Sequence, residues 1–120
     1  MPIGLPSLSK FTKQEISKLF SSARRCLKQP SLDILLSPTL TGSLGRILVI
    51  TSRRIGNAPT RNKVRRRFKA IYHEGQFPQR GYDCIVIVKP EGVRRTFDEL
   101  KMLLNKAFES PYLPKKPHDQ

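Results

Sequence analysis

The chain has 120 residues, which is enough for one domain with a modest hydrophobic core and too few for two. Its 23 Lys and Arg residues against 9 Asp and Glu residues give a formal net charge of +14, so we expect a polyanionic partner, nucleic acid first and an anionic membrane surface second. No stretch is continuously apolar for the roughly 20 residues that span a bilayer, and no basic region followed by an apolar one marks a secretory signal. We therefore expect a cytoplasmic protein that has no membrane partner.

A capping box predicts the first helix. Thr12 is followed three residues later by Glu15, the spacing at which each side chain caps the other's backbone N–H group. We expect the helix over about residues 12–23, after an irregular segment at residues 1–9. Its apolar positions form one narrow stripe: Ile16, Leu19, Phe20 and Ala23. Phe20 is either a core residue of this stripe or a nucleic-acid contact.

Three strand candidates follow the first helix. Residues 24–29 predict a short strand, and residues 32–36 predict another that ends at Ser37 and Pro38, because proline lacks the N–H group that a strand needs. Residues 46–52 have the strongest strand pattern, since they are rich in β-branched side chains.

A basic helix follows a turn at Gly56 and Asn57, two residue types that tolerate positive φ. It begins between Asn57 and Thr60, because Pro59 is acceptable only in a first helical turn, and it ends near Gly75 as the C′ residue. One side of this helix is an apolar stripe that faces the core: Val64, Phe68, Ile71 and Tyr72. The other sides carry Arg61, Asn62, Lys63, Arg65, Arg66, Arg67 and Lys69.

The last third of the chain predicts one strand and one helix. Residues 82–88 are nearly all apolar, as in a strand that is buried on both faces. Residues 90–95 link this strand to a helix that opens with a second capping box, Thr96 with Glu99. The core stripe of that helix is Phe97, Leu100, Leu103, Leu104, Ala107 and Phe108.

The order of elements is helix, two or three strands, helix, strand, helix, which predicts a single α+β domain with helices packed on a mixed sheet. We expect this domain over residues 1–110, because three prolines after residue 109 interrupt regular structure and leave residues 111–120 as a mobile tail rich in Pro and Lys. Cys26 and Cys84 fall in different elements far apart in the chain, so we expect buried free thiols.

The basic segment from Ser52 to Tyr72 holds eight cations and no carboxylate. Like charges at i,i+4, such as Arg61 with Arg65, cost a few tenths of a kcal/mol per pair, roughly, and positive charge near a helix N-terminus opposes the helix dipole. A merely solvated helix face normally mixes both signs of charge. We therefore expect an anionic ligand, and Arg and Asn suit nucleic acid because they bind phosphate oxygens, base edges and sugar hydroxyls.

Two runs in this segment carry a resemblance to a known family. They are Arg53-Arg54-Ile55-Gly56-Asn57-Ala58 and, two residues later, Arg61-Asn62-Lys63-Val64-Arg65-Arg66. They resemble the signature of the protein subunit of bacterial ribonuclease P, the ribonucleoprotein endonuclease (a hydrolase) that removes the 5′ leader from precursor tRNA. The resemblance extends over about residues 8–108. It implies the order αβββαβα, a mixed four-stranded sheet, and a left-handed strand-helix-strand crossover around the basic helix, which is a rare exception to the right-handed rule.

The resemblance also implies partners and sites. In this family the RNA subunit carries the chemistry with bound Mg²⁺, so the protein alone is not expected to cleave RNA, to hold Mg²⁺ or to need an obligate protein partner. The residues that would bind the RNA subunit are Arg53, Arg54, Asn57, Arg61, Asn62, Lys63, Arg65, Arg66 and Lys69. A cleft between the first helix and the sheet would bind the 5′ leader, at Lys13, Ile16 and Phe20. The family most often has Arg where this chain has Lys63, and an aromatic residue where it has Ile16.

The residues themselves argue against catalysis by the protein alone. A protein nuclease needs clustered carboxylates for metal ions, or a pair of His residues for acid–base work. Here the acids are scattered or serve as helix caps, and the histidines are His73 at a helix end and His118 in the tail. Two other classes stay open: a ribosomal or other RNA-packing protein, which does not predict the Gly-Asn-Ala to Arg-Asn spacing, and a DNA-binding module, for which the basic helix lacks a helix-turn-helix partner.

Overall fold

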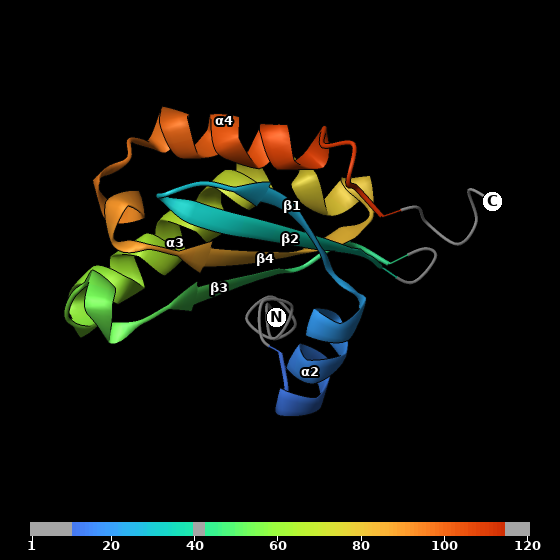
Figure 1. Cartoon of the computed structure of the whole chain (residues 1–120), viewed down its shortest axis with the longest axis horizontal. Coiled ribbons are helices and arrows are strands. Elements are labelled where there is room, and N and C mark those ends of the chain that lie inside the picture. The colour runs from blue at the N-terminus through green and yellow to red at the C-terminus, as the bar shows by residue number, and fades with distance from the viewer. Residues whose placement is uncertain (1–10, 40–42, 115–120) are drawn as a thin grey trace, which may run out of the picture.

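The computed structural model describes residues 11–39 and 43–114 (Figure 1). The helices are α2 (Lys13–Ser22), α3 (Ala58–Glu74) and α4 (Phe97–Phe108). The strands are β1 (Arg24–Lys28), β2 (Leu32–Pro38), β3 (Ile47–Thr51) and β4 (Tyr82–Val88). Short 3₁₀ turns connect them: η1 (Arg53–Ile55), η2 (Phe77–Arg80) and η3 (Pro90–Arg94). This is the predicted order αβββαβα; the irregular segment predicted at residues 1–9 lies outside the described residues.

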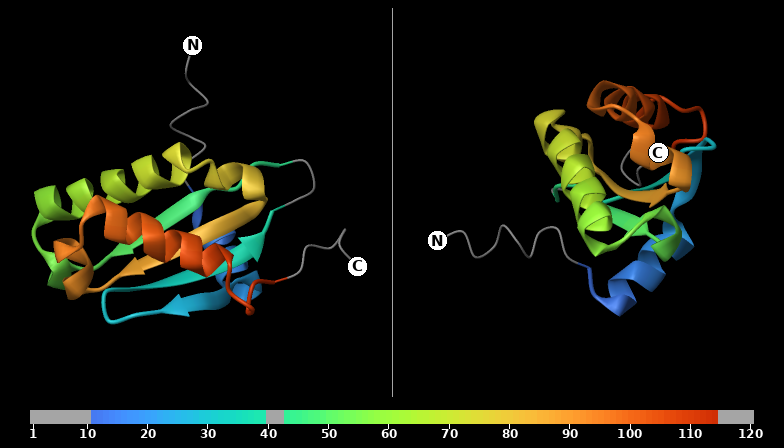
Figure 2. Two further views of the ribbon diagram at one scale, coloured as in Figure 1. Left: turned by 90° about the horizontal axis from the view of Figure 1, so that it is seen from above. Right: turned by 90° about the vertical axis from the view of Figure 1, so that its left-hand side faces the viewer.

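The four strands form one mixed sheet in the order β1-β2-β4-β3. The β1–β2 and β2–β4 pairs are antiparallel, whereas β3 and β4 are parallel. A parallel pair needs a crossover connection, which α3 supplies. In the left panel of Figure 2, α3 lies in front of the sheet, and β4 lies to the left of β3 when both strands are turned to point upward. The crossover is therefore left-handed, as the resemblance implied.

The helices are divided between the two faces of the sheet (Figure 2). The main core lies between the sheet and the α3–α4 pair, and its largest fully buried side chains include Phe68, Tyr72 and Phe77. On the opposite face Leu19 of α2 packs against Leu35 and Ile85. Within residues 11–39 and 43–114, α3 and α4 thus cover one side of the sheet, and α2 covers part of the other.

The capping boxes predicted for α2 and α4 are both present. The Thr12 hydroxyl accepts a hydrogen bond from the Glu15 N–H at 3.1 Å, and the Thr96 hydroxyl accepts one from the Glu99 N–H at 3.1 Å. In each box the Glu carboxylate accepts the reciprocal bond from the Thr backbone N–H at 2.9 Å. Both helices therefore begin where the local sequence specifies.

The predicted strand of residues 32–36 is two residues too short, because β2 includes Ser37 and ends at Pro38. The next N–H group of β2 that faces β4 is that of Thr39, which donates to the carbonyl of Gly81 at 3.0 Å. The Pro38 nitrogen faces the opposite edge, where β1 pairs with β2 only as far as Leu36. The missing N–H group of proline thus breaks no ladder hydrogen bond.

The prediction for the C-terminal end of α3 is also wrong in detail. Gly75 was predicted as the C′ residue, but it is the C-cap, with φ −81°, and the next residue, Gln76, has the left-handed conformation typical of C′, with φ 58°. Space explains the glycine, because a Cβ atom at Gly75 would collide with the buried ring of Phe77.

Phe97 and the predicted tail differ from expectation as well. Phe97 is 38% exposed rather than part of the core stripe, because it is the first residue of α4 and lies beyond the packed part of the stripe. Residues 111–114, at the start of the predicted tail, pack on the domain: Leu113 contacts the main core, and the Tyr82 hydroxyl donates to the Pro114 carbonyl at 2.8 Å. Residues 115–120 lie outside the described residues.

Cys26 and Cys84 are buried free thiols, as predicted. Burial raises the pKa of both thiols above the ordinary value. Both side chains belong to the main core, so they act as small hydrophobic residues.

Candidate nucleic-acid interface

Helix α3 divides into a buried stripe and a basic face, as the sequence predicted. Its four predicted core residues are 5% exposed or less: Val64, Phe68, Ile71 and Tyr72. We define the basic face as eight residues that lie away from this stripe. Two of them, Arg53 and Arg54, belong to η1, and the others belong to α3: Arg61, Asn62, Lys63, Arg65, Arg66 and Lys69. Asn62, Lys63 and Arg66 are exposed, and Arg61, Arg65 and Lys69 are partly exposed.

The charge of the basic face is not neutralised by carboxylates among the described residues. The ion pairs of that part of the chain involve other cations: Arg25–Asp33, Arg46–Glu15, Lys89–Asp33 and Arg95–Glu99. All eight Lys and Arg residues of η1 and α3, the seven of the basic face and Arg67, therefore lack an acidic partner within 4.0 Å in residues 11–39 and 43–114. Such a surface attracts polyanions and holds them more weakly as salt increases.

Two arginines of the basic face are oriented by hydrogen bonds. Arg61 Nη1 donates to the Gly56 carbonyl at 3.1 Å, and Arg65 Nη1 donates to Asn62 Oδ1 at 3.2 Å. A guanidinium group has five N–H donors, so each retains donors for phosphate oxygens. The side chains are thus partly ordered before any ligand binds.

The turn before α3 explains the spacing of the Gly-Asn motif. Ile55 is 7% exposed and anchors η1 in the main core. Gly56 has φ +140°, and a Cβ atom there would lie 3.0 Å from Cγ2 of Thr60, so only glycine fits. Asn57 is the N-cap of α3, and its Oδ1 accepts from the Thr60 N–H at 3.0 Å. The motif therefore fixes where α3 begins, and it leaves Asn57 only its amide NH₂ group for a ligand.

A second surface lies where α2 meets the sheet. Lys13, Ile16 and Phe20, which the resemblance implied for leader binding, are spaced by three and four residues and share one side of α2. Lys13 is exposed, Ile16 is partly buried and Phe20 is 40% exposed. Leu19, rather than Phe20, enters the core, so the interpretation of Phe20 as a core residue is wrong.

The described residues, 11–39 and 43–114, cover the sheet beside α2 only in part, and we call the part that they leave uncovered the open face. Its half-buried apolar side chains are Leu48 and Ile50 of β3 and Ile87 of β4. They lie on the side of the sheet opposite α3 and α4. Apolar side chains next to cations on α2 offer a contact surface for unstacked bases.

Arg46 ties α2 to the sheet, an interaction that the sequence analysis missed. Its Nη2 donates to Glu15 Oε2 at 2.9 Å, and its guanidinium lies 4.2 Å from the ring centroid of Phe11. The Arg46 N–H also donates to Asp83 Oδ1 at 2.8 Å. Arg46 and Glu15 are 31 residues apart, so no local pattern signals their pairing.

The carboxylates of this region differ in their titration. The pKa of Glu15 is lowered, chiefly by the hydrogen bond from the Thr12 N–H and then by Arg46. The pKa of Asp83 is raised by burial, which the hydrogen bond from the Arg46 N–H offsets only in part. Each acid is used as a structural acceptor.

The described residues contain neither a cluster of metal ligands nor a helix that could span a membrane. No group of three His, Cys, Asp or Glu side chains there is close enough to hold a metal ion. His73 is exposed in the last turn of α3. No helix within residues 11–39 and 43–114 combines the length and the apolar character needed to cross a bilayer.

Comparison with known proteins identifies relatives. The sequence model of the family described as "Ribonuclease P" matches residues 9–112. The "Ribonuclease P protein component" of Erythrobacter litoralis is 32% identical over 106 residues, which cover 81% of this chain and 86% of that protein.

Solved structures share the fold. An RNase P protein mutant of Staphylococcus aureus superimposes with a TM-score of 0.73 at 14% identity, covering 90% of this chain and 91% of that one. The RNase P protein of Thermotoga maritima superimposes with a TM-score of 0.67 at 18% identity, covering 80% and 90%. At these identities the likeness establishes the αβββαβα fold and nothing finer.

Proposed function

The chain belongs to the ribonuclease P protein family and is thus the protein component of a tRNA-processing ribonucleoprotein, and from this premise we propose that it binds the catalytic RNA through the basic face and the 5′ leader of precursor tRNA beside α2. Family membership establishes an RNA partner and a part in an endoribonuclease holoenzyme. The two binding surfaces are the proposal.

The observation that carries the first surface is the uncompensated charge of the basic face. Its cations oppose one another along α3, and among the described residues no carboxylate relieves this repulsion. Phosphates of a folded RNA supply the missing charge, and Arg65 and Arg66 offer planar donor sets that match phosphate oxygens. We assign Arg53, Arg54, Asn57, Arg61, Asn62, Lys63, Arg65, Arg66 and Lys69 to this interface.

The surface beside α2 supports leader binding. Phe20 exposes an aromatic ring, Ile16 lies one turn before it, and Lys13 provides a cation one turn earlier again. Stacking or apolar contact with bases together with a cation for the backbone is how single-stranded nucleic acid is bound with little sequence preference.

Mg²⁺ fits the RNA better than it fits this chain. Protein Mg²⁺ sites need one or two available carboxylates. Among the described residues, no three His, Cys, Asp or Glu side chains lie close enough together to hold a metal ion, and Asp33 Oδ1 is paired with Lys89 Nζ at 2.9 Å. We therefore propose that the RNA holds the Mg²⁺ and carries the cleavage step, while the protein positions RNA and leader.

Reconstitution tests the proposal. The purified chain is added to the catalytic RNA with no other protein, and 5′ maturation of precursor tRNA is measured at low Mg²⁺. We expect cleavage by the mixture and none by the protein alone. Cleavage by the protein without RNA would refute the assignment of the chemistry.

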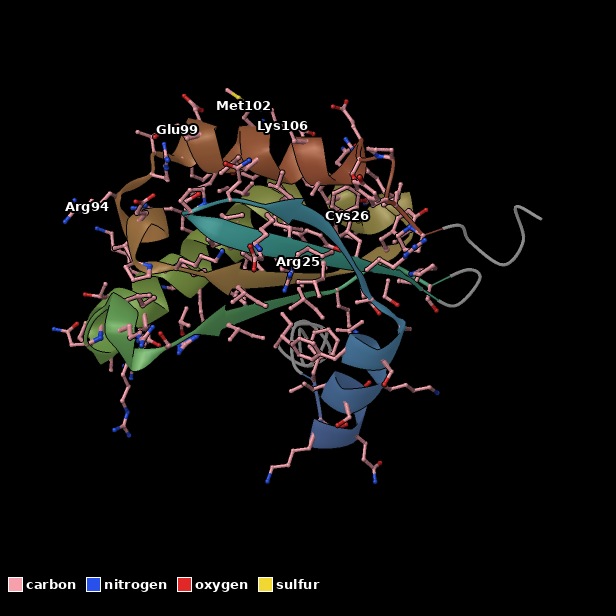
Figure 3. All side chains as sticks on the ribbon, in the orientation of Figure 1. Arg25, Cys26, Arg94, Glu99, Met102 and Lys106 are labelled. Atoms are coloured by element: carbon pink, nitrogen blue, oxygen red, sulfur yellow. The ribbon has the colours of Figure 1, made fainter. Side chains whose placement is uncertain are left out.

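A pair of variants tests the basic face. Arg66→Ala removes an exposed cation of α3, whereas Lys106→Ala removes an exposed cation of α4 on another side of the molecule (Figure 3). We expect Arg66→Ala to weaken assembly with the catalytic RNA roughly tenfold, as loss of a charge-assisted hydrogen bond does, and Lys106→Ala to have little effect. Equal affinities for the two variants, or preferred binding to ribosomal RNA or DNA, would favour the rival classes.

A further inference from the structure

Helix α2 is attached unevenly along its length. Its C-terminal end is fixed, because only Ala23 separates the helix from β1 and the Ser22 hydroxyl lies 2.7 Å from that of Ser37. Leu19 is the one buried residue of the helix. The segment before it, residues 13–18, spans roughly 9 Å of helix, carries no buried side chain and extends away from the sheet (Figure 1). This half of α2 therefore needs another attachment to keep its position.

Arg46 supplies that attachment through two contacts, which we call the Arg46 bridge. Its Nη2 donates to Glu15 Oε2 at 2.9 Å, and its guanidinium lies 4.2 Å from the ring centroid of Phe11. Glu15 belongs to the first turn of α2, and Phe11 directly precedes the capping box that opens the helix. One side chain of the sheet thus contacts the chain on both sides of the point where α2 begins.

Arg46 itself is fixed to the sheet by its backbone. Its N–H donates to Asp83 Oδ1 at 2.8 Å, and its carbonyl accepts from the Cys84 N–H at 2.8 Å. It lies two residues before Leu48, so both side chains lie on the same side of the sheet. The Arg46 side chain is 28% exposed, so solvent screens the bridge only in part. The bridge therefore connects α2 to a part of the molecule that is rigid.

The residues held by the Arg46 bridge are those that we assign to the leader. Lys13 and Ile16 lie on either side of Glu15 in the chain, whereas Phe20 lies beyond Leu19, near the fixed end of α2. A helix of 10 residues is too short to persist without tertiary contacts, so its unattached half would fray. A ligand binds more tightly to groups that are already ordered, because less conformational entropy is lost on binding.

We propose that Arg46 is a positioning residue for the 5′ leader: through Glu15 and Phe11 it orders the N-terminal half of α2, so that Lys13 and Ile16 are in place before the leader binds. The inference rests on the proposed function, and it assigns Arg46 a role through α2 rather than a contact with RNA.

Four variants test this role. Arg46→Met removes the charge of the bridge and keeps an apolar stem, whereas Arg46→Lys keeps a cation for Glu15 and Phe11. Glu15→Gln weakens the bridge without removing a cation, and Gln also serves in a capping box. The matched control is Arg95→Met, because Arg95 likewise pairs with the Glu of a capping box, Glu99 at 3.2 Å, but at the start of α4 on the opposite side of the sheet.

Each variant is measured in two ways. Hydrogen exchange of the α2 amides in the free protein reports how well the helix is ordered. Titration of the reconstituted holoenzyme with precursor tRNA, and with mature tRNA, which lacks the leader, reports leader binding.

We expect Arg46→Met to speed exchange in the N-terminal half of α2 and to weaken precursor binding on the order of fivefold, the scale of a partly exposed ion pair and a cation–π contact together. Binding of mature tRNA should stay unchanged. Arg46→Lys should recover most of the loss, and Arg95→Met should change neither measurement. Wild-type exchange in Arg46→Met, or faster exchange with unchanged precursor binding in a holoenzyme that still prefers precursor to mature tRNA, would overturn this inference alone.

Glu15→Gln separates positioning from a direct contact between Arg46 and a phosphate. Positioning predicts that the variant binds precursor tRNA about twofold more weakly, and that the same change has less effect when Arg46→Met has already removed the bridge. A direct contact predicts stronger binding, because Glu15 would no longer compete with the phosphate. Stronger binding, or additive effects of the two changes, would overturn the inference. A wild-type holoenzyme with no preference for precursor tRNA would instead overturn the proposed leader binding.

Discussion

Asp83 shows how one buried carboxylate makes folding depend on pH. Burial raises its pKa above the unfolded value, although its Oδ1 accepts the Arg46 N–H at 2.8 Å. A carboxyl group whose folded pKa is raised costs no stability while it is protonated, below its unfolded pKa, and costs stability as the pH rises through the folded pKa. Burial of Asp83 therefore lowers the free energy of unfolding once the pH is above the unfolded pKa of this carboxyl group.

Replacing Asp83 with Asn should remove this pH dependence. The variant Asp83→Asn keeps a side-chain oxygen that accepts the Arg46 N–H, but it does not ionise. We expect the free energy of unfolding of the variant, relative to that of the wild type, to increase as the pH rises from about 4 to 7. Urea titrations at both ends of this range measure the gap between the two proteins. A gap that stays constant or narrows would show that Asp83 does not control the dependence.

Local residue chemistry was predictable from the sequence, whereas non-local pairs were not. Thr12 with Glu15 and Thr96 with Glu99 are three residues apart, so their capping bonds are encoded by spacing alone. The pairs Arg46–Glu15 and Arg25–Asp33 depend on which strands and helices meet. Their partners became identifiable only from the tertiary arrangement.

At the scale of elements, α3 is a helix whose exposed face is selected for something other than stability. Arg66 has Lys63 and Lys69 three residues away on either side, and all three are cations. Opposite charges at such spacings stabilise a helix by about 0.2–0.5 kcal/mol per pair, and like charges destabilise it by similar amounts. Stability and RNA binding therefore make opposite demands on this position.

Charge reversal at Arg66 should separate these demands. We expect Arg66→Glu to leave the free energy of unfolding unchanged or to raise it by about 0.5 kcal/mol, because the new carboxylate has Lys63 and Lys69 as neighbours. Assembly with the catalytic RNA should weaken more than in Arg66→Ala. Denaturant unfolding and RNA titration measure the two effects, and Lys101→Glu on the exposed side of α4 is the matched control for RNA binding. A large loss of stability with unchanged RNA affinity would contradict the assignment.

The predictions of element boundaries were wrong where the boundary depends on a neighbouring strand or side chain. Ser37 and Pro38 were expected to lie beyond the end of β2, but β1 has already ended on that side of the strand, so the missing N–H group of Pro38 costs nothing and β2 includes both residues. Gly75 was expected as the C′ residue, but it is the C-cap, and the ring of Phe77 is what requires a glycine there. Periodicity identified the strands and helices, whereas these details depend on what packs beside them.

The whole molecule adds a feature that periodicity does not encode. The left-handed β3-α3-β4 crossover departs from the general rule, and it was expected only from the resemblance in the Gly-Asn and Arg-Asn runs. The two proposed binding surfaces likewise arise from the packing of helices on the sheet. Among the described residues, α3 and α4 cover one face of the sheet, and α2 covers only part of the other. Both the basic face and the open face follow from this unequal cover.

The net charge of +14 makes a prediction for the molecule as a whole. In the free protein the excess cations repel one another, so added salt should screen the repulsion and raise the unfolding midpoint. In the complex that we propose, the same cations bind phosphates, so added salt should weaken RNA binding, with a slope that grows with the number of contacts. A series in which KCl rises from about 0.05 to 0.5 M tests both effects. Over this range the screening length falls from roughly 14 Å to roughly 4 Å. A midpoint that falls with salt would show that repulsion among the cations is already balanced within the free protein, and the basic face would then need no polyanion to explain it.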